Sequence, residues 1–202
     1  MRYDVIIVGG GASGLSCALT LASAQGRGWD WAENKRYLVL DTGRSDMNRA
    51  LFKNVPGIEQ GLTGKEILER IKAQIKSYGG VDFMEEKVVK VEGSDGEFRV
   101  FTDSGKHFES DIVVLASGFH RFDIECEGVE LVDNPKSPKP GRVMVKHDGD
   151  YKVREGLYVA GLLAGASSMF TCAAGSGVQV AINILSRWAG RPVVIHDVPE
   201  GS

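Results

Sequence analysis

Cysteine is scarce in this chain of 202 residues, which has only Cys17, Cys126 and Cys172. The three residues are odd in number and far apart in the sequence, which indicates neither a disulfide framework nor a zinc site. Free thiols are typical of reducing compartments, so we expect a cytoplasmic protein. The chain is long enough to bury a sizeable hydrophobic core without such cross-links.

Long hydrophobic runs and a strong excess of charge are also absent. No stretch approaches the roughly 20 apolar residues that span a bilayer. The apolar run at 5–8 is far too short for the core of a signal peptide. The formal net charge is −3, which indicates no basic surface for nucleic acid. We therefore expect neither a membrane nor a nucleic acid among the partners.

Glycine, by contrast, is abundant, with 26 residues, and glycine gathers where the backbone turns tightly or approaches a ligand. The first cluster, GGGASG at 9–14, follows a β-branched run at 3–8 that predicts a buried parallel strand. Residues 13–25 then have apolar side chains at helical spacing, and residues 37–41 (YLVLD) predict a second buried strand. Strand, glycine turn, helix and strand follow one another as in a dinucleotide-binding unit.

The remaining segments predict an α/β fold. Thr63 and Glu66 form a capping-box pattern at the start of an amphipathic helix over 63–79. Alternating side chains between DG and SG turns predict an antiparallel β-meander over about 81–110. The later elements that we expect are strands at 111–118, 142–147 and 157–161 and a final helix at 174–190. We therefore predict a single domain over 1–202, a Rossmann-like parallel sheet with an inserted antiparallel meander.

The glycine pattern GxGxxG has a physical role at each glycine. Gly9 allows the tight turn, Gly11 lets the backbone approach a pyrophosphate, and Gly14 lets helix and strand pack closely. The helix N-terminus offers unpaired N–H groups to the phosphates. Asp41 ends the next strand and would accept hydrogen bonds from ribose hydroxyls, although its distance of 27 residues from Gly14 exceeds the usual value of about 20. The alternative is a glycine turn that merely connects strand to helix.

Five short motifs follow one another along the chain: IIVGGGASG (6–14), NVPG (54–57), VVLASG (113–118), GLYVAG (156–161) and AAGSGVQVA (173–181). In this order they resemble the FAD-binding domain of the thioredoxin reductase-like flavoproteins, within the wider two-dinucleotide-binding-domain family. The resemblance covers nearly the whole chain, and it implies that the cofactor is FAD.

The resemblance also implies a role for each matching position along the FAD molecule. The implied cofactor-binding residues are Gly9, Gly11, Ala12, Ser13 and Gly14 at the pyrophosphate, Asp41 and Thr42 at the adenosine ribose, Val88 at the adenine, Ala116, Ser117 and Gly118 on the adenosine side, Gly161 and Leu162 at the ribityl chain, Asn54 near the isoalloxazine, and Ala174, Gly175, Ser176 and Gly177 at the flavin pyrimidine edge. The last four would start a helix whose positive end stabilises negative charge on reduced flavin.

The sequence also departs from the family pattern. Related reductases carry an inserted NADPH domain with a second glycine loop and a redox-active CxxC, and this chain has neither motif. Leu162 stands where the family has an Asp that binds a ribityl hydroxyl, and Ser168 and Met169 replace an Arg-Gln pair. Loss of one polar contact costs about 1 kcal/mol, which weakens FAD binding without abolishing it.

Several other residues have both a functional and a structural interpretation. Cys172 is a weak catalytic candidate because a thiol near the flavin could exchange electrons with it, but we favour a small buried residue. Carboxylates near Cys126 should raise the pKa of its thiol. His120 is expected at the surface, and Trp29 and Trp31 form either an interface contact or part of the core.

The leading functional hypothesis is an FAD-dependent oxidoreductase of the thioredoxin reductase-like type. Its flavin would be reduced by a separate electron-donor protein or by NAD(P)H that binds transiently. The alternative is a non-catalytic flavin-binding subunit or sensor, which Leu162 and the missing donor domain favour. A site for NAD in place of FAD is disfavoured by the late AAGSG helix. By resemblance, the chain would form a homodimer.

Overall fold

The computed structural model describes residues 1–197. In this part of the chain five strands run parallel, in the order β5-β2-β1-β8-β13. Their bounds are Val81–Glu85 for β5, Tyr37–Asp41 for β2, Arg2–Val8 for β1, His107–Leu115 for β8 and Leu157–Val159 for β13. The predicted Rossmann-like parallel sheet is therefore confirmed, with β1 at its centre.

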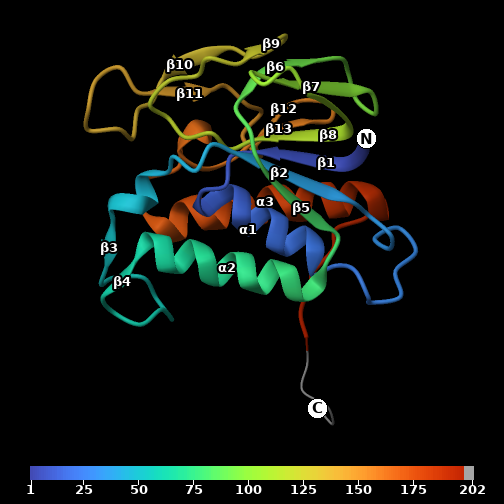
Figure 1. Cartoon of the computed structure of the whole chain (residues 1–202), viewed down its shortest axis with the longest axis horizontal. Coiled ribbons are helices and arrows are strands. Elements are labelled where there is room, and N and C mark those ends of the chain that lie inside the picture. Colours follow the sequence, from blue (N-terminus) through green and yellow to red (C-terminus); the bar gives the residue numbers. More distant parts are fainter. Residues whose placement is uncertain (198–202) are drawn as a thin grey trace.

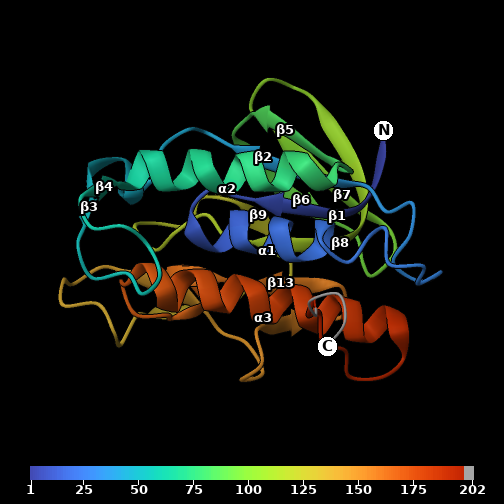
Figure 2. The same cartoon turned by 90° about the horizontal axis from the view of Figure 1, so that it is seen from below.

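The helices α1 (Ala12–Ala22), α2 (Gly64–Tyr78) and α3 (Phe170–Ala189) cover one face of this sheet (Figure 1). Helix α1 lies between α2 and α3 (Figure 2). The predicted amphipathic pattern of α2 is confirmed, because Ile67, Ile71 and Ile75 are buried against the other elements. Helix α3 begins four residues earlier than the predicted start at 174.

The opposite face is covered by antiparallel strands (Figure 1), which confirms an inserted meander in outline. Strands β6 (Val88–Glu92) and β7 (Phe98–Thr102) pair antiparallel, and β7 pairs antiparallel with the first half of β8. The expected range of 81–110 is too long, because β5 pairs parallel with β2 and belongs to the main sheet. As an edge strand, β5 exposes Asp82 and Glu85 and only half-buries its apolar side chains, so its sequence pattern imitates a meander strand.

Smaller elements complete the fold. Strand β9 (Glu125–Cys126) extends the sheet beside β6, and β12 (Lys152–Arg154) pairs with β13. Strands β10 (Leu131–Asp133) and β11 (Val143–Val145) form a separate hairpin, which accounts for the strand predicted at 142–147. The remaining elements are β3 (Leu51–Phe52), paired with β4 (Leu62–Thr63), and the 3-10 helices η1 (Asp46–Arg49) and η2 (Gly161–Ala164).

Successive side chains of β1 point to opposite faces of the sheet and so contribute to two separate layers of the core. Val5 and Ile7 pack under the helices, whereas Ile6 and Val8 pack under the antiparallel layer. All four side chains are at most 5% exposed, and complete burial of such a side chain stabilises the fold by about 1.5–3 kcal/mol. Burial on both faces explains why β1 reads as a continuous apolar run.

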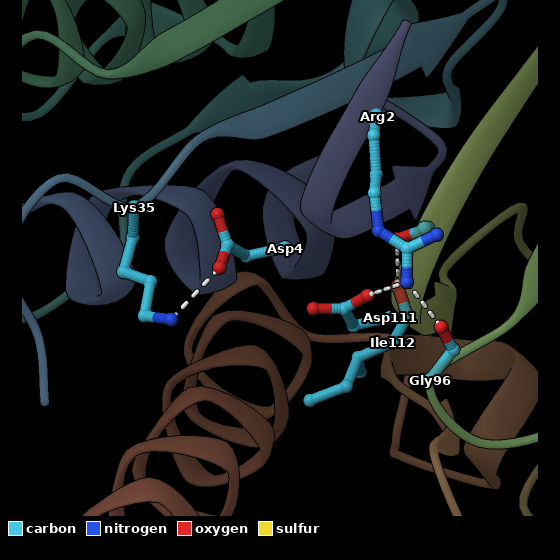
Figure 3. A network of polar contacts seen from close by, with 7 residues as sticks. Arg2, Asp4, Lys35, Gly96, Asp111 and Ile112 are labelled. Atoms are coloured by element: carbon cyan, nitrogen blue, oxygen red, sulfur yellow. Dashed lines mark hydrogen bonds and ion pairs between the residues drawn. The ribbon is translucent and has the colours of Figure 1, made fainter.

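Charged side chains fasten the amino ends of the strands. Arg2 on β1 contacts Asp111 on β8 and the Gly96 carbonyl, and Lys35 Nζ lies 2.8 Å from Asp4 Oδ1 (Figure 3). The Lys35–Asp4 pair is about a quarter exposed. The carboxyl ends of the same strands lie at the opposite edge of the sheet and run into glycine turns.

Candidate functional site

The carboxyl ends of β1, β2, β8 and β13 meet at one edge of the sheet. Three backbone hydrogen bonds of 2.8 Å hold the segments that follow these strands side by side. They are donated by Gly9 N–H to the Leu40 carbonyl, by Ala116 N–H to the Val8 carbonyl, and by Ala160 N–H to the Leu115 carbonyl. Ligands of open α/β sheets bind at this edge, beside the strand where the connections change direction.

Two glycines of the 9–14 turn are required by the fold. Gly9 has a φ of +119°, and a Cβ there would collide with the Ala116 carbonyl. A Cβ on Gly14 would collide with the Gly9 carbonyl. These two positions allow the turn to pack directly between β8 and α1, and they would need glycine with or without a ligand.

Gly11 differs from both, because the fold does not require glycine at this position. Its φ of −82° is accessible to any residue, and the nearest atom to a Cβ would be Ser45 Oγ, at 3.5 Å. Gly10, which the sequence analysis passed over, makes room for the Asp41 carboxyl group, whose Cγ would lie 2.7 Å from its Cβ. The missing side chain of Gly11 therefore leaves open space in front of α1.

The N-terminus of α1 is free to bind an anion. Its N-cap residue is Gly11, so no side chain caps the helix, and the first turn has no acidic residue. The N–H groups of Ala12, Ser13 and Gly14 have no carbonyl partner within the helix. Unpaired N–H groups and the positive end of the helix dipole together favour a phosphate group. The residues present therefore fit the pyrophosphate of a dinucleotide.

The predicted residues Ser176 and Gly177 lie where α3 crosses α1. A Cβ on Gly177 would collide with the Ser13 carbonyl, and a Cβ on Gly161 would lie against the Ser13 side chain. Ser176 Oγ accepts a hydrogen bond from Gly161 N–H and donates one to the Ala173 carbonyl, each at 2.7 Å. In the structure these residues hold α3 and η2 in place, beside the glycine turn.

The prediction that Ala174, Gly175, Ser176 and Gly177 start the last helix is wrong, because they form its second turn. The first turn is formed by residues 170–173 and, like that of α1, has neither a side-chain cap nor an acidic residue. Sequence reasoning placed the start at the glycine pattern. The tertiary structure extends the helix, because the Phe170 ring packs edge-on against Phe52 with centroids 5.9 Å apart.

This aromatic contact brings the predicted Asn54 segment to the start of α3. Asn54 is exposed and lies two residues after Phe52. Leu162 is half-buried in η2, and its carbonyl accepts a hydrogen bond of 2.9 Å from the side chain of Asn134. Asn134, which no motif singled out, thus ties the β10–β11 hairpin to η2.

Cys172 is exposed, so our preferred interpretation of it as a small buried residue is wrong. The buried stripe of α3 includes Ala173, Ser176 and Gly177, and Cys172 falls outside this stripe. Its position in the first turn follows from the earlier start of the helix.

The predicted adenosine-binding residues lie on both sides of β1, after β2 and after β8. Asp41 ends β2, and its carbonyl accepts a hydrogen bond of 3.0 Å from Glu86 N–H, at the corner that leads to Val88. Thr42 is exposed. The residues Ala116, Ser117 and Gly118 follow β8, where Ala116 is buried, Ser117 is exposed and Gly118 has a φ of +84°.

Other candidate residues have structural surroundings of their own. His120 is exposed as predicted, and its Nε2 lies 2.8 Å from Asp46 Oδ2. Burial, more than the carboxylates that we expected, raises the pKa of the Cys126 thiol. Trp29 and Trp31 stack with centroids 5.2 Å apart and are half-buried against the core, which favours the structural interpretation.

Within residues 1–197, no helix is long and apolar enough to cross a bilayer, and no group of three or more His, Cys, Asp or Glu side chains could hold a metal ion. A hollow of about 350 Å³ lies between the C-terminal ends of α1 and α2, where Thr20 and Tyr78 are among the residues that line it. It lies at the amino edge of the sheet, away from the carboxyl ends of the parallel strands.

Comparison with known proteins agrees with this geometry. The chain is 26% identical to a thioredoxin reductase of Aquifex aeolicus over an alignment 212 residues long. The alignment covers 95% of this chain and 59% of that protein. The chain therefore spans little more than half the length of this relative. A thioredoxin reductase from Gloeobacter violaceus has the same fold, with a TM-score of 0.75 at 15% identity, over 98% of this chain and 99% of that one.

A ferredoxin-flavin thioredoxin reductase from Clostridium acetobutylicum also has this fold, with a TM-score of 0.69 at 15% identity. The alignment covers 94% of this chain and 99% of that one. The sequence pattern of one family matches residues 3–154. This match takes in the glycine turn, β2, the meander and β8. The chain belongs to the pyridine nucleotide-disulphide oxidoreductase family.

Proposed function

We propose that this chain binds FAD along the carboxyl edge of its parallel sheet. The observation that carries the proposal is Gly11, which has no side chain although the fold has room for one. Gly9 and Gly14 are explained by packing, but Gly11 is explained by the close approach of a ligand to the helix N-terminus.

The chain offers groups for each part of the cofactor. The free N–H groups of Ala12, Ser13 and Gly14 would hold the pyrophosphate. The Asp41 carboxylate would accept hydrogen bonds from the adenosine ribose hydroxyls, and it would repel a ribose 2′-phosphate. At the other end, the first turn of α3 would favour negative charge on the flavin pyrimidine edge.

We further propose that the protein is an FAD-dependent oxidoreductase of the thioredoxin reductase-like type. Bound FAD would supply two-electron chemistry at its isoalloxazine ring, while Asn54 and the start of α3 would position the ring and Leu162 would lie at the ribityl chain. The electrons would come from a separate donor protein or from NAD(P)H. A separate donor is supported by the structural neighbour named a ferredoxin-flavin thioredoxin reductase.

A second candidate is a flavin-binding subunit or sensor without turnover of its own. Leu162 favours it, because the side chain is half-buried and apolar where related proteins have a carboxylate for the ribityl chain. The fold accommodates an apolar residue here, since the Leu162 side chain packs against the hydrophobic core under the helices. The cost in FAD affinity is about one neutral hydrogen bond, or about 1 kcal/mol.

FAD binding is tested by titrating the purified protein with FAD and recording the flavin absorption and fluorescence. We expect saturable binding to the wild type. For Asp41→Asn we expect affinity about tenfold lower, because a charge-assisted hydrogen bond becomes a neutral one. Failure of the wild type to bind FAD would contradict the proposal.

The two candidate functions are separated by mixing the FAD-loaded protein anaerobically with NADH, NADPH or reduced ferredoxin. Bleaching of the flavin within seconds by one of these donors supports an oxidoreductase. No bleaching with any of them supports a flavin-binding subunit or sensor.

The proposal also includes an oligomeric state and a cellular location for the protein. We infer a homodimer from the resemblance alone, and light scattering at several protein concentrations tests it. A cytoplasmic location suits the free thiols of Cys17, Cys126 and Cys172.

A further inference from the structure

The corner between β5 and β6 contains a carboxylate that is almost completely buried. The side chain of Glu86 is 6% exposed. It accepts hydrogen bonds from Lys106 Nζ and from Ser104 Oγ, the latter at 2.6 Å. These two bonds, from Lys106 first and then from Ser104, lower the pKa of Glu86 from 4.5 to about 2. Glu86 is therefore ionised whenever the protein is folded near neutral pH.

Backbone hydrogen bonds fasten the same corner on both sides. Glu86 N–H donates to the Asp41 carbonyl at 3.0 Å, which ties the corner to the end of β2. Asp103 N–H donates to the Lys87 carbonyl at 2.9 Å, which ties it to the turn between β7 and β8. The corner thus joins the ribose-binding end of β2 to the antiparallel layer.

A β-bulge follows directly after the corner. Val88 pairs with Thr102 and Lys90 pairs with Phe101, which leaves Val89 without a partner in β7. Strand β9 pairs with β6 from Lys90 onward. Among the described residues, Val89 therefore stands outside the residue pairings of both neighbouring strands, where the bulge interrupts the ladder.

We propose that Glu86 is a positioning residue for adenine recognition by this corner, an inference that rests on the proposed binding of FAD. The edge of adenine offers an amino group that donates and a ring nitrogen that accepts. The backbone at Val88 and Val89 has the complementary carbonyl and N–H groups. Glu86 fixes the distance between these groups and Asp41, so that base and ribose are bound together.

The exposure of its partner Lys106 supports the role of Glu86 in positioning the corner between β5 and β6. Lys106 is 61% exposed, so it returns to water at little cost when its partner is neutralised. The effect of such a change falls on the corner itself, because Lys106 and Ser104 bond to different carboxylate oxygens and a glutamine keeps only one acceptor oxygen for the two donors. The corner is then held by its backbone hydrogen bonds alone, and the Val88–Val89 backbone is less firmly positioned relative to Asp41.

The test compares FAD with FMN, which lacks the adenosine half. For Glu86→Gln we expect the Kd for FAD to rise about tenfold, with the Kd for FMN unchanged. The matched control is Glu85→Gln, which removes the same charge one residue earlier from an exposed side chain. Lys106→Arg preserves the bond to Glu86 and should leave the Kd for FAD near the wild-type value.

Each outcome decides the matter. Equal weakening of FAD and FMN by Glu86→Gln means a general structural role and overturns the inference. Unchanged FAD binding also overturns it, while the proposed function stands. A wild-type protein that binds FMN but not FAD overturns both. If Glu86→Gln does not fold, Ser104→Ala removes one hydrogen bond and should raise the Kd for FAD alone about threefold.

Discussion

Helices α1, α2 and α3 cover the same face of the sheet (Figure 1), but only α2 has a side-chain cap at its N-terminus. In α2, Thr63 Oγ1 accepts a hydrogen bond from Glu66 N–H, and the Glu66 carboxylate accepts one from Thr63 N–H at 2.8 Å. In α1 and α3, no side chain caps the helix and the first turn has no acidic residue.

The difference follows from what each N-terminus faces. The start of α2 packs against η1, so close that a Cβ on Gly64 would collide with the Met47 carbonyl. Its N–H groups must therefore be satisfied by the chain itself. The starts of α1 and α3 flank the carboxyl edge of the sheet, where a ligand can satisfy them. Under the proposed function, a missing cap marks a binding end and a cap marks a structural end.

The largest effect is expected from giving α1 the cap that it lacks. Gly11→Asp places a carboxylate at the N-cap, where it stabilises the protein without FAD by a few tenths of a kcal/mol. The same charge repels the pyrophosphate by several kcal/mol, so we expect FAD affinity to fall at least about a hundredfold. Thermal unfolding without FAD and FAD titration measure the two effects.

Gly11→Asn is the matched control for that change, because it supplies a cap of the same size without the charge. A Gly11→Asp protein that binds FAD as tightly as the wild type would show that α1 does not face the pyrophosphate.

The capped helix gives the opposite result. Thr63→Ala removes the cap of α2 and should destabilise the fold by about 1 kcal/mol, with FAD affinity unchanged. The hydrogen bonds from Thr63 also lower the pKa of Glu66. Their stabilising effect is present above pH 4.5 and is lost as the pH falls, so the variant should lose stability less steeply in acid.

Chemical denaturation at pH 7 and pH 4 measures both quantities. Thr63→Ser is the control, since serine caps a helix equally well. A change in FAD affinity for Thr63→Ala would contradict the division between binding and structural ends.

The smallest effect is expected at α3, where the N-cap residue is the half-exposed Met169. Its extended backbone suits a capping side chain, so Met169→Asp should stabilise the protein without FAD by about 0.5 kcal/mol. The added negative charge should lower the reduction potential of bound flavin, because it disfavours negative charge on the reduced ring.

Redox titration of the FAD-loaded variant measures the potential, and Met169→Asn separates charge from capping. An unchanged potential in Met169→Asp would mean that the start of α3 does not face the flavin.

Local sequence patterns were sufficient to predict the elements that are stabilised by contacts between residues close together in the sequence. The run at 3–8, the turn at 9–14 and the capping box at Thr63 were predicted correctly, because each depends on neighbours within a few residues. Long-range contacts were not predictable in this way. Asn134 in the β10–β11 hairpin donates a hydrogen bond to η2, and Lys106 donates one to Glu86. No sequence motif predicts either contact.

The sequence by itself determined the α/β class, the glycine turn and the acidic end of the second strand, because strand and helix periods and glycine spacing are local properties. Only the tertiary structure decided which glycines serve packing and which leave room for a ligand, since a collision at Gly14 or Gly177 involves backbone from another element or another part of the turn. It also decided where α3 begins, because Phe170 is held in the helix by Phe52, a residue more than a hundred positions earlier.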